Sequence, residues 1–385
     1  MGGLGRSKMF KRTDGALPLS KVTDILQISE RRFWIRQAKI QIGQDAPCQQ
    51  GEAKMTKKTD TDPMSREWHW HPELPVKHAP YWLWPPRPAA LTKWVWQNWL
   101  QFSDRSIFLA LSFLVAFWLQ PIGQEQAGLG FGWVAWVFLR NWLLLSIVAG
   151  GLHHWFYGID GQGKLQKFDP RPYSKRKNAL FKFGYQTWDN VYYSMTSGAT
   201  FLSAIECFLR WSYASGLIST LSFSAHPVWF ILMFPLLALW QSFHFYVVHL
   251  FLHQPKICKH VHSVHHSNVN TGPWSGMSMH PVEALTYLSA ILVVLVLPSH
   301  PVHMLFLGYW LMLGAASSHS GYDAMWTRDR QALLLGAFLH QLHHRYYECN
   351  YGNAEMPWDK WFGTYHDGSE EATQRTRNRK RQMQS

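Results

Sequence analysis

The stretch that decides the fold is Pro227–His266, with the sequence PVWFILMFPLLALWQSFHFYVVHLFLHQPKICKHVHSVHH. Its first part, Pro227–Val248, is a nearly continuous apolar run, long enough for a helix that crosses the hydrocarbon core of a bilayer, which takes about 20 residues. Histidines begin where this run ends, at His249 and His253. The stretch therefore predicts a membrane-spanning helix that carries imidazoles to one membrane surface.

Other apolar segments lie on both sides of this one. A tryptophan-rich run, Trp82–Trp99, precedes the first of them and is typical of a segment at the water–lipid interface. Pro298, Ser299 and His300 alone separate the last two, which predicts a tight helical hairpin. We therefore expect an all-α integral membrane protein built from helical hairpins. The further candidate spans are Ser106–Gln120, Phe131–Leu152, Ala199–Leu221, Val282–Leu297 and Pro301–Ser318.

The composition agrees with a membrane protein. Only 16% of the 385 residues are charged, whereas soluble domains carry about 25%. The 47% hydrophobic content excludes disorder of the whole chain. Four cysteines far apart, with no CxxC pair, exclude a disulfide scaffold and favour reduced thiols. The net charge of +13 comes from basic residues beside the apolar runs, so we expect a membrane and no nucleic acid as the partner.

The distribution of basic residues predicts the topology. The turns 121–130, 222–226 and 298–300 contain no Lys or Arg, whereas residues 153–198 and everything after Ser318 are basic. Because basic loops stay in the cytoplasm, three hairpins with both termini cytoplasmic satisfy every loop. We expect a multi-pass protein of the endoplasmic reticulum if the source is eukaryotic, or of the inner membrane if it is bacterial.

Charged residues inside two candidate spans leave an alternative open. Glu206 and Arg210 are costly in lipid unless they pair at i, i+4 spacing. Without such a pair, Ala199–Leu221 is interfacial and Pro227–Val248 is re-entrant; we favour the full span. Arg140 lies within the second span, and we expect it to face the bundle or to snorkel rather than to act as a relay.

Three histidine boxes carry the chemistry. At i, i+4 spacing two imidazoles share one helical face, and in the HxxHH boxes we expect i, i+3 and i+4 to converge on one point. Eight imidazoles exceed the needs of one tetrahedral metal, so two metals are the natural count. The predicted topology brings the boxes to one cytoplasmic face, where His319 joins them in a histidine-rich cap. The box residues are His249, His253, His262, His265, His266, His340, His343 and His344.

Simpler explanations apply to isolated histidines more than to three boxes in order. His244 and His280 are balanced between a role at the metals and a plain structural role. Glu283 and Asp323 are candidate acceptors for imidazole N–H groups, or else surface or helix-capping carboxylates. Imidazole suits Zn, Cu, Fe and Ni alike. The absence of CxxC argues against a zinc finger, and the absence of HExxH against a zinc protease. A pair of metals with only neutral ligands suits O₂ activation.

The order of the boxes resembles the fatty acid hydroxylase superfamily, which includes sterol desaturases and sphingolipid hydroxylases. The resemblance covers residues 227–368. Family members commonly have Asp seven residues before the first box histidine, where this chain has Ser242, so the group that supports His249 is not apparent. Further matches are Tyr246, HPVE at His280–Glu283, HSGYD at His319–Asp323, NYG at Asn350–Gly352 and PWDKWFGTYHDG at Pro357–Gly368.

This resemblance implies an integral membrane oxygenase with a non-haem di-iron centre, in which the eight box histidines and His319 bind two Fe ions. It would use O₂ as co-substrate to hydroxylate or desaturate a sterol, sphingolipid or fatty acyl chain. Electrons would come from NAD(P)H indirectly, through a small carrier such as a b-type cytochrome or a ferredoxin and its reductase. The motifs do not determine the lipid or the choice between hydroxylation and desaturation.

The alternative is a divalent-metal binding or transport protein, which needs polar ligands near the bilayer midplane. The last two candidate spans offer little beyond Glu283, Thr286, His303 and Tyr309, so the enzyme is favoured. We expect a disordered extension at 1–64, an N-terminal membrane region at 65–226 with the tryptophan-rich interfacial segment, a catalytic domain at 227–368 and a basic tail at 369–385.

Overall fold

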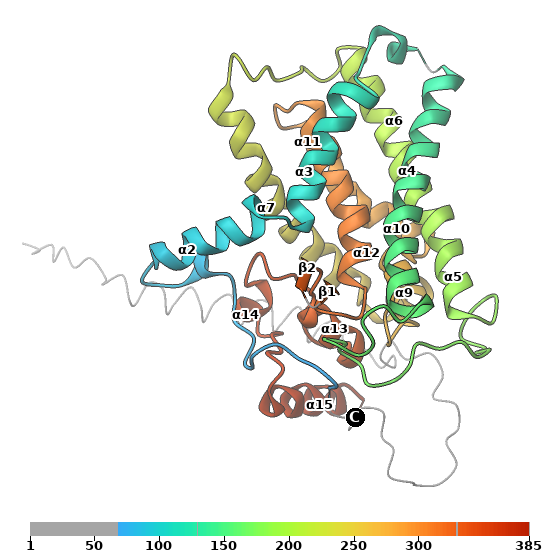
Figure 1. Ribbon diagram of the computed structural model, residues 1–385, viewed down its shortest axis with the longest axis vertical. Coiled ribbons are helices and arrows are strands. Elements are labelled where there is room, and N and C mark those ends of the chain that lie inside the picture. The colour runs from blue at the N-terminus through green and yellow to red at the C-terminus, as the bar shows by residue number, and fades with distance from the viewer. Residues whose placement is uncertain (1–67, 129, 329, 385) are drawn as a thin grey trace, which may run out of the picture. The chain divides into compact units, whose positions relative to one another are not determined.

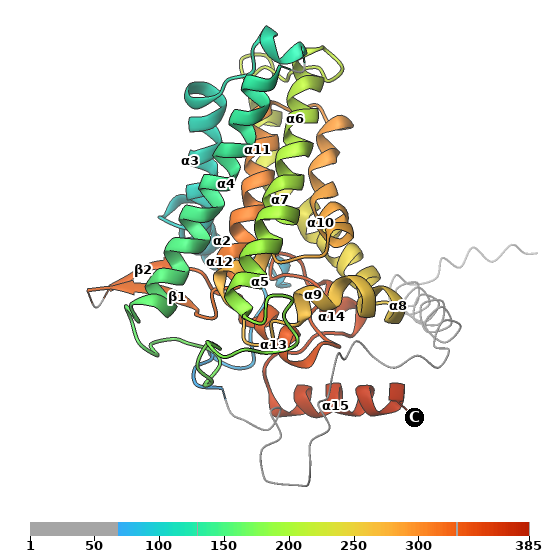
Figure 2. The same cartoon turned by 90° about the vertical axis from the view of Figure 1, so that its right-hand side faces the viewer.

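The computed structural model describes residues 68–128, 130–328 and 330–384, so the expected extension at 1–64 lies outside the described residues. The described part is mostly helical, as expected. Its long helices stand side by side, and the shorter elements that carry the histidine boxes gather at one end of them, next to the C-terminal helix (Figures 1 and 2).

Several of the long helices continue through a tighter or wider turn. Helix α3 (Asp104–Leu114) extends to Leu119, and α4 (Phe131–His153) extends to Gly158. A π-helical segment joins α5 (Gln186–Tyr193) to α6 (Thr200–Ala214), and another joins α11 (Pro301–Tyr309) to α12 (Ala315–Ser318). The remaining long elements are α2 (Pro88–Val95), α7 (Pro227–Leu252) and α10 (Pro281–Leu288), which runs on as a 3₁₀ helix to Leu295.

Four short helices and the C-terminal helix form the cap at the histidine-bearing end. They are α8 (Pro255–Ile257), α9 (Ser263–His266), α13 (Phe338–Tyr346), α14 (Trp358–Phe362) and α15 (Glu370–Gln384). Strands β1 (Ala324–Thr327) and β2 (Arg330–Leu334) form an antiparallel hairpin with a register shift between Met325 and Trp326.

Two helices are long and apolar enough to cross a membrane: Phe131–Gly158 and Pro227–Leu252. A third candidate is the pair Pro88–Leu100 and Asp104–Leu119, bent by 46°. Six spans were expected because apolar composition alone does not show whether a segment forms one helix long enough to cross a bilayer. In the described chain the helix at Pro281–Leu295 is apolar but shorter than a span. The hairpin topology and the cytoplasmic termini stay predictions.

The charged residues of the bundle pair with one another. Glu206 accepts a hydrogen bond from Arg210 Nε at 2.7 Å, which is the expected i, i+4 pair, and it also forms an ion pair with Arg140. Asn141 Nδ2 donates to the same carboxylate at 2.9 Å. Arg140 is 5% exposed, so it faces the bundle as expected. These contacts tie α4 to α6 in the interior.

The cysteines only partly follow the sequence. Cys207 and Cys349 are free and buried, as expected, whereas Cys258 is disulfide-bonded, which contradicts the expectation of reduced thiols there.

Candidate metal centre

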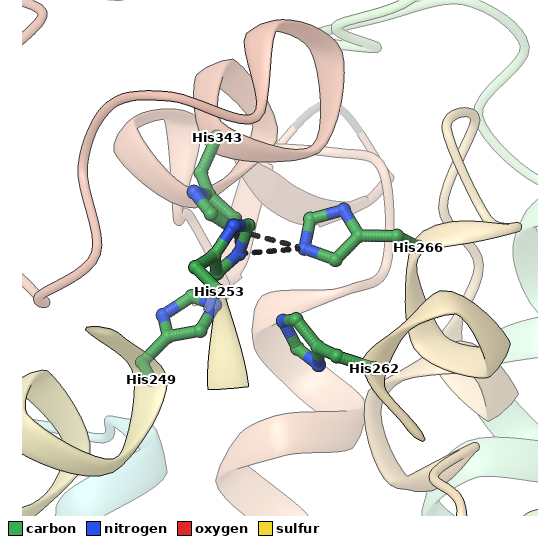
Figure 3. Close-up of side chains that lie close together, drawn as sticks. All are labelled: His249, His253, His262, His266 and His343. Atoms are coloured by element: carbon green, nitrogen blue, oxygen red, sulfur yellow. Dashed lines mark hydrogen bonds between the residues drawn. The ribbon is translucent and has the colours of Figure 1, made fainter. Parts of the chain in front are cut away.

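The nine predicted histidines meet in two groups at the capped end of the bundle. Within each group one nitrogen from every ring lies within 4.8 Å of all the others. Figure 3 shows the rings of the larger group pointing toward a common centre from the C-terminal end of α7, from α9 and the segment that leads into it, and from α13. Group 1 is His249, His253, His262, His266 and His343, and group 2 is His265, His319, His340 and His344.

Each HxxHH box divides between the two groups, which corrects the expectation that its three rings converge on one point. His262 and His266 belong to group 1 and His265 to group 2, whereas His340 and His344 belong to group 2 and His343 to group 1. At about 100° per residue, position i+4 lies about 40° to one side of position i and position i+3 about 60° to the other. The i, i+4 pair therefore serves one centre, and the i+3 ring serves the neighbouring one.

The spacing of the ring nitrogens matches that of metal ligands. In group 1 the Nε2 atoms of His253, His266 and His343 are 3.0–3.2 Å apart, and in group 2 the contacts among Nε2 atoms are 3.0–3.3 Å. Nitrogens about 2.1 Å from one ion lie about 3.0 Å apart at octahedral angles and about 3.4 Å apart at tetrahedral angles. The observed separations fall in this range.

Acceptors around the groups fix the tautomers of four rings. Nδ1 of His249 lies 2.7 Å from the Tyr351 carbonyl, and Nδ1 of His343 lies 2.7 Å from the Cys349 carbonyl. A carbonyl oxygen only accepts, so Nδ1 carries the proton and Nε2 presents its lone pair to the group. Nδ1 of His319 likewise lies 2.8 Å from the Ala315 carbonyl, and Nδ1 of His262 lies 2.7 Å from Glu283 Oε1.

These lone pairs fit a pair of cations. Nε2 of His262 is buried and has no hydrogen-bond partner among the described residues, although an unpaired buried acceptor is costly. Three mutually close Nε2 atoms, one of them on His343 with its proton at Nδ1, cannot all be satisfied by hydrogen bonds among themselves. Burial lowers the pKa of His262, His266, His343 and His344 well below its ordinary value, which keeps these rings neutral, the form that binds metal.

The loop that supports His249 is held in place from two helices. Both oxygens of Asp359 accept from the loop, Oδ1 from Tyr351 N–H and Oδ2 from Gly352 N–H, each at 2.8 Å. Ser242, at the position where the family resemblance led us to expect Asp, donates to Asn353 Oδ1 at 2.6 Å and so binds the same loop to α7. The support of His249 is therefore a backbone carbonyl, held in place from α14 and α7, which sequence reasoning missed.

Of the other predicted site residues, one contacts a histidine of the two groups and three do not. Glu283 holds His262, as described above. His244 Nε2 contacts Ser289 Oγ at 3.0 Å, and His280 caps α10 by accepting from Val282 N–H at 3.2 Å, so both lie outside the two groups and make structural contacts. The carboxylate of Asp323 makes no hydrogen bond to any described residue and lines the adjoining cavity.

A cavity of about 320 Å³ adjoins the two groups, a size at the lower end of the range for small-molecule sites. Both groups contribute to its wall, group 1 through His249 and His262, and group 2 through His265, His319 and His340. Apolar side chains cover much of the rest, among them Phe245, Val248, Leu252, Met279 and Leu339. Elsewhere the wall is polar, with Asp104, Arg105, Gln241, Asn353 and Glu355. The cavity can hold an apolar molecule next to both groups.

Comparison with known proteins gives one family. The fatty acid hydroxylase model matches residues 234–364. A Delta(7)-sterol 5(6)-desaturase of Aspergillus fumigatus is 30% identical over 151 residues, which cover 39% of this chain and 42% of the relative. The Delta(7)-sterol 5(6)-desaturase of Saccharomyces cerevisiae is 31% identical over 121 residues, which cover 31% of this chain and 32% of the relative. The chain thus spans less than half the length of these curated relatives.

No solved structure matches the chain. The matched region contains most of α7, both HxxHH boxes and the loop that supports His249, so the family match and the two histidine groups describe the same part of the molecule. Residues 234–364 of this chain are therefore similar to the fatty acid hydroxylase family.

Proposed function

We propose that the protein is a membrane di-iron oxygenase that hydroxylates or desaturates a lipid with O₂. The observation that carries the proposal is the pair of histidine groups, whose converging Nε2 lone pairs adjoin one largely apolar cavity. Imidazole ligands suit iron, and an apolar cavity suits a lipid chain or ring system. The matches to Delta(7)-sterol 5(6)-desaturases support a sterol as the first lipid to test.

Group 1 would hold one iron and group 2 the other. Bound iron would supply the activation of O₂ and the attack on an unactivated C–H bond. The protein's own part is positional: the acceptors at Nδ1 of His249, His262, His319 and His343 fix the orientation of the rings. The apolar wall excludes water and places the substrate carbon beside the imidazoles.

The proposed reaction also requires a source of electrons. In hydroxylation one oxygen atom enters the lipid and the other leaves as water, which requires two electrons and two protons from outside. In desaturation both oxygen atoms leave as water, and the lipid itself supplies two of the four hydrogens. We infer a small carrier protein, a b-type cytochrome or a ferredoxin, that is reduced by NAD(P)H through its reductase. The carrier would meet a cytoplasmic cap on a multi-pass protein whose termini are both cytoplasmic.

The structure disfavours transport of divalent metals. Among the described residues of the bundle, the buried charged cluster that joins α4 to α6 has two guanidinium groups and one carboxylate, from Arg140, Arg210 and Glu206. A cluster with net positive charge repels a divalent cation, so it is a poor site along a conduction path.

Anaerobic purification followed by metal analysis tests the proposal. We expect about two irons per chain, and an O₂-dependent lipid product with one added oxygen or two fewer hydrogens. His343→Ala and His265→Ala remove one ligand from each group, so iron content and product should fall together in both variants.

His260→Ala is the matched control, because His260 is exposed and lies in the same segment between His253 and His262. It should keep both the iron and the activity. A protein that binds iron at the expected stoichiometry but yields no oxidised lipid with any reductant would contradict the proposed reaction.

A further inference from the structure

Arg105 occupies an unusual place in the wall of the cavity. It lies in the first turn of α3, and its guanidinium carbon is 5.1 Å from the ring centroid of Trp310, 5.3 Å from Trp94 and 5.7 Å from Trp99. Indole faces attract a cation, and three of them around one guanidinium exclude water from it. The group is therefore held in place, desolvated, at the edge of the space that also adjoins the histidines.

The hydrogen bonds of this guanidinium are incomplete. One terminal nitrogen, NH2, pairs with Glu355 Oε1, whereas Nε and the other terminal nitrogen, NH1, are buried and have no partner among the described residues. Buried donors without acceptors are rare because they lose their water without compensation. Two unused donors on a residue that lines a cavity indicate an acceptor brought by a ligand.

The partner carboxylate is equally well fixed. Tyr81 O–H donates to the Glu355 carbonyl and lies 3.1 Å from Glu355 Oε2, and Trp82 Nε1 donates to the same carbonyl at 2.8 Å. Its backbone N–H donates to Asn353 Oδ1 at 3.2 Å, and Asn353 is bound in turn to Ser242 of α7. Ser242 precedes His249 by seven residues, which is about 10 Å along a helix. A single lipid molecule is long enough to reach from the polar cluster to the histidine groups over such a distance.

The charges in this cluster select the kind of polar group. Arg105 is opposed by two carboxylates that line the same cavity, Glu355 and Asp104, so the three together carry a formal charge of −1. Lys77 also lines the cavity, but its ammonium is largely exposed and pairs with Glu73. A carboxylate or sulfate would meet net repulsion here. A hydroxyl accepts from a guanidinium N–H and donates to a carboxylate, so it satisfies both partners.

We propose that Arg105 and Glu355 bind the hydroxyl group of an alcohol-bearing lipid, and that this anchor sets how deeply the lipid reaches toward the histidines. The proposal rests on the proposed function, because it takes the occupant of the cavity to be the lipid that is oxidised. It assigns a substrate class, neutral lipid alcohols, in preference to free fatty acids and other anions.

Equilibrium binding to the full-length, metal-loaded protein tests this without turnover. The probes form two series: cholesterol, its 3-methyl ether and its 3-sulfate; and octadecanol, its methyl ether and stearate. The ether cannot donate a hydrogen bond to the Glu355 carboxylate, and hydrogen bonds to charged groups are strong. We therefore expect an alcohol to bind about ten- to a hundredfold more tightly than its ether in at least one series, with the anion weakest.

Arg105→Gln should reduce the preference for alcohol over ether to within about twofold, while Lys77→Gln, at the exposed side of the cavity, should leave it intact. The preference of the wild-type protein is itself a test that needs no variant to fold. Equal binding of alcohol and ether in both series, tighter binding of an anion, or no binding of either series overturns the proposal. A clear alcohol preference in a protein that never oxidises lipid would uphold the anchor and overturn the oxygenase instead.

Discussion

Replacement of Asp359 by Asn tests whether the loop behind His249 orients that ring. Asp359 is 5% exposed and accepts three hydrogen bonds, from Tyr351 N–H, Gly352 N–H and Thr364 Oγ1. The Tyr351 carbonyl, on the same loop, accepts from Nδ1 of His249 at 2.7 Å. The carboxylate therefore acts on the metal centre through the backbone and touches no ligand itself.

The magnitude follows from these contacts. Asn keeps one acceptor oxygen but turns an NH₂ group toward a backbone N–H, so at least one charge-assisted hydrogen bond is replaced by a contact between two donors. Such a bond contributes about 1.5–3 kcal/mol. Loss of a group that orients a metal ligand typically lowers metal affinity about 10- to 100-fold. We expect Asp359→Asn to weaken iron binding by that factor, which is about 1.4–2.7 kcal/mol.

The assay is competition for Fe(II) between the anaerobic protein and a chelator of known affinity. Asp367→Asn is the matched control, since Asp367 Oδ1 accepts from Ser369 N–H and Oγ and makes no hydrogen bond to the loop behind His249. The control should bind iron like the wild type. If Asp359→Asn loses thermal stability but keeps wild-type iron affinity, the Tyr351 carbonyl does not orient His249 and the reasoning fails.

Two further outcomes are expected. Glu206→Gln leaves Arg140 and Arg210 as two buried cations without a counter-charge, whereas Arg210→Met leaves Arg140 and Glu206 as a pair with no net charge. In thermal unfolding of the detergent-solubilised protein, Glu206→Gln should therefore lower the free energy of unfolding by about 3–5 kcal/mol, and by more than Arg210→Met does. Glu125 is exposed, so Glu125→Gln is the control and should leave the stability unchanged. Burial raises the pKa of Asp323 to about 6, so its folded state binds more protons than its unfolded state between about pH 4 and 6, and stability falls as the pH rises through that window. Asp323→Asn should therefore stabilise the protein by about 1–2 kcal/mol at pH 7.5, after allowance for its partial exposure, and by nearly nothing at pH 4; an equal effect at both pH values would contradict this assignment.

The sequence was informative where the chemistry is local. The i, i+4 spacing of His340 and His344, and of His262 and His266, predicted rings that share one site, and the structure brings each pair together. The intervening i+3 rings, His343 and His265, were placed wrongly because a common point was assumed, whereas the rotation of the helix directs them to a second centre. Because of this rotation, each HxxHH box contributes rings to both histidine groups.

The features of the site that could not be predicted from the sequence depend on contacts between distant segments and on backbone atoms. The carbonyls of Tyr351, Cys349 and Ala315 hold three rings, and a carbonyl has no signature in the sequence because every residue has one. The NYG and PWDKWFG motifs were the only sequence signal near Cys349 and Tyr351. Arg105 and Glu355 are 250 positions apart, so no periodicity could pair them.

The acceptors behind the imidazoles also determine the charge of the site. Of the four rings whose Nδ1 position is fixed, three are held by neutral carbonyls and only His262 by a carboxylate, Glu283. Two divalent ions would therefore bring a charge of about +4 into a buried space whose ligands are all neutral and which has one carboxylate directly behind them, on the side of group 1. Group 1, with five rings and that carboxylate, would be the better site for a dication, and an ion in group 2, with four neutral rings, would be the more electrophilic of the two. The two histidine groups therefore offer chemically unequal surroundings to a metal ion before any substrate arrives.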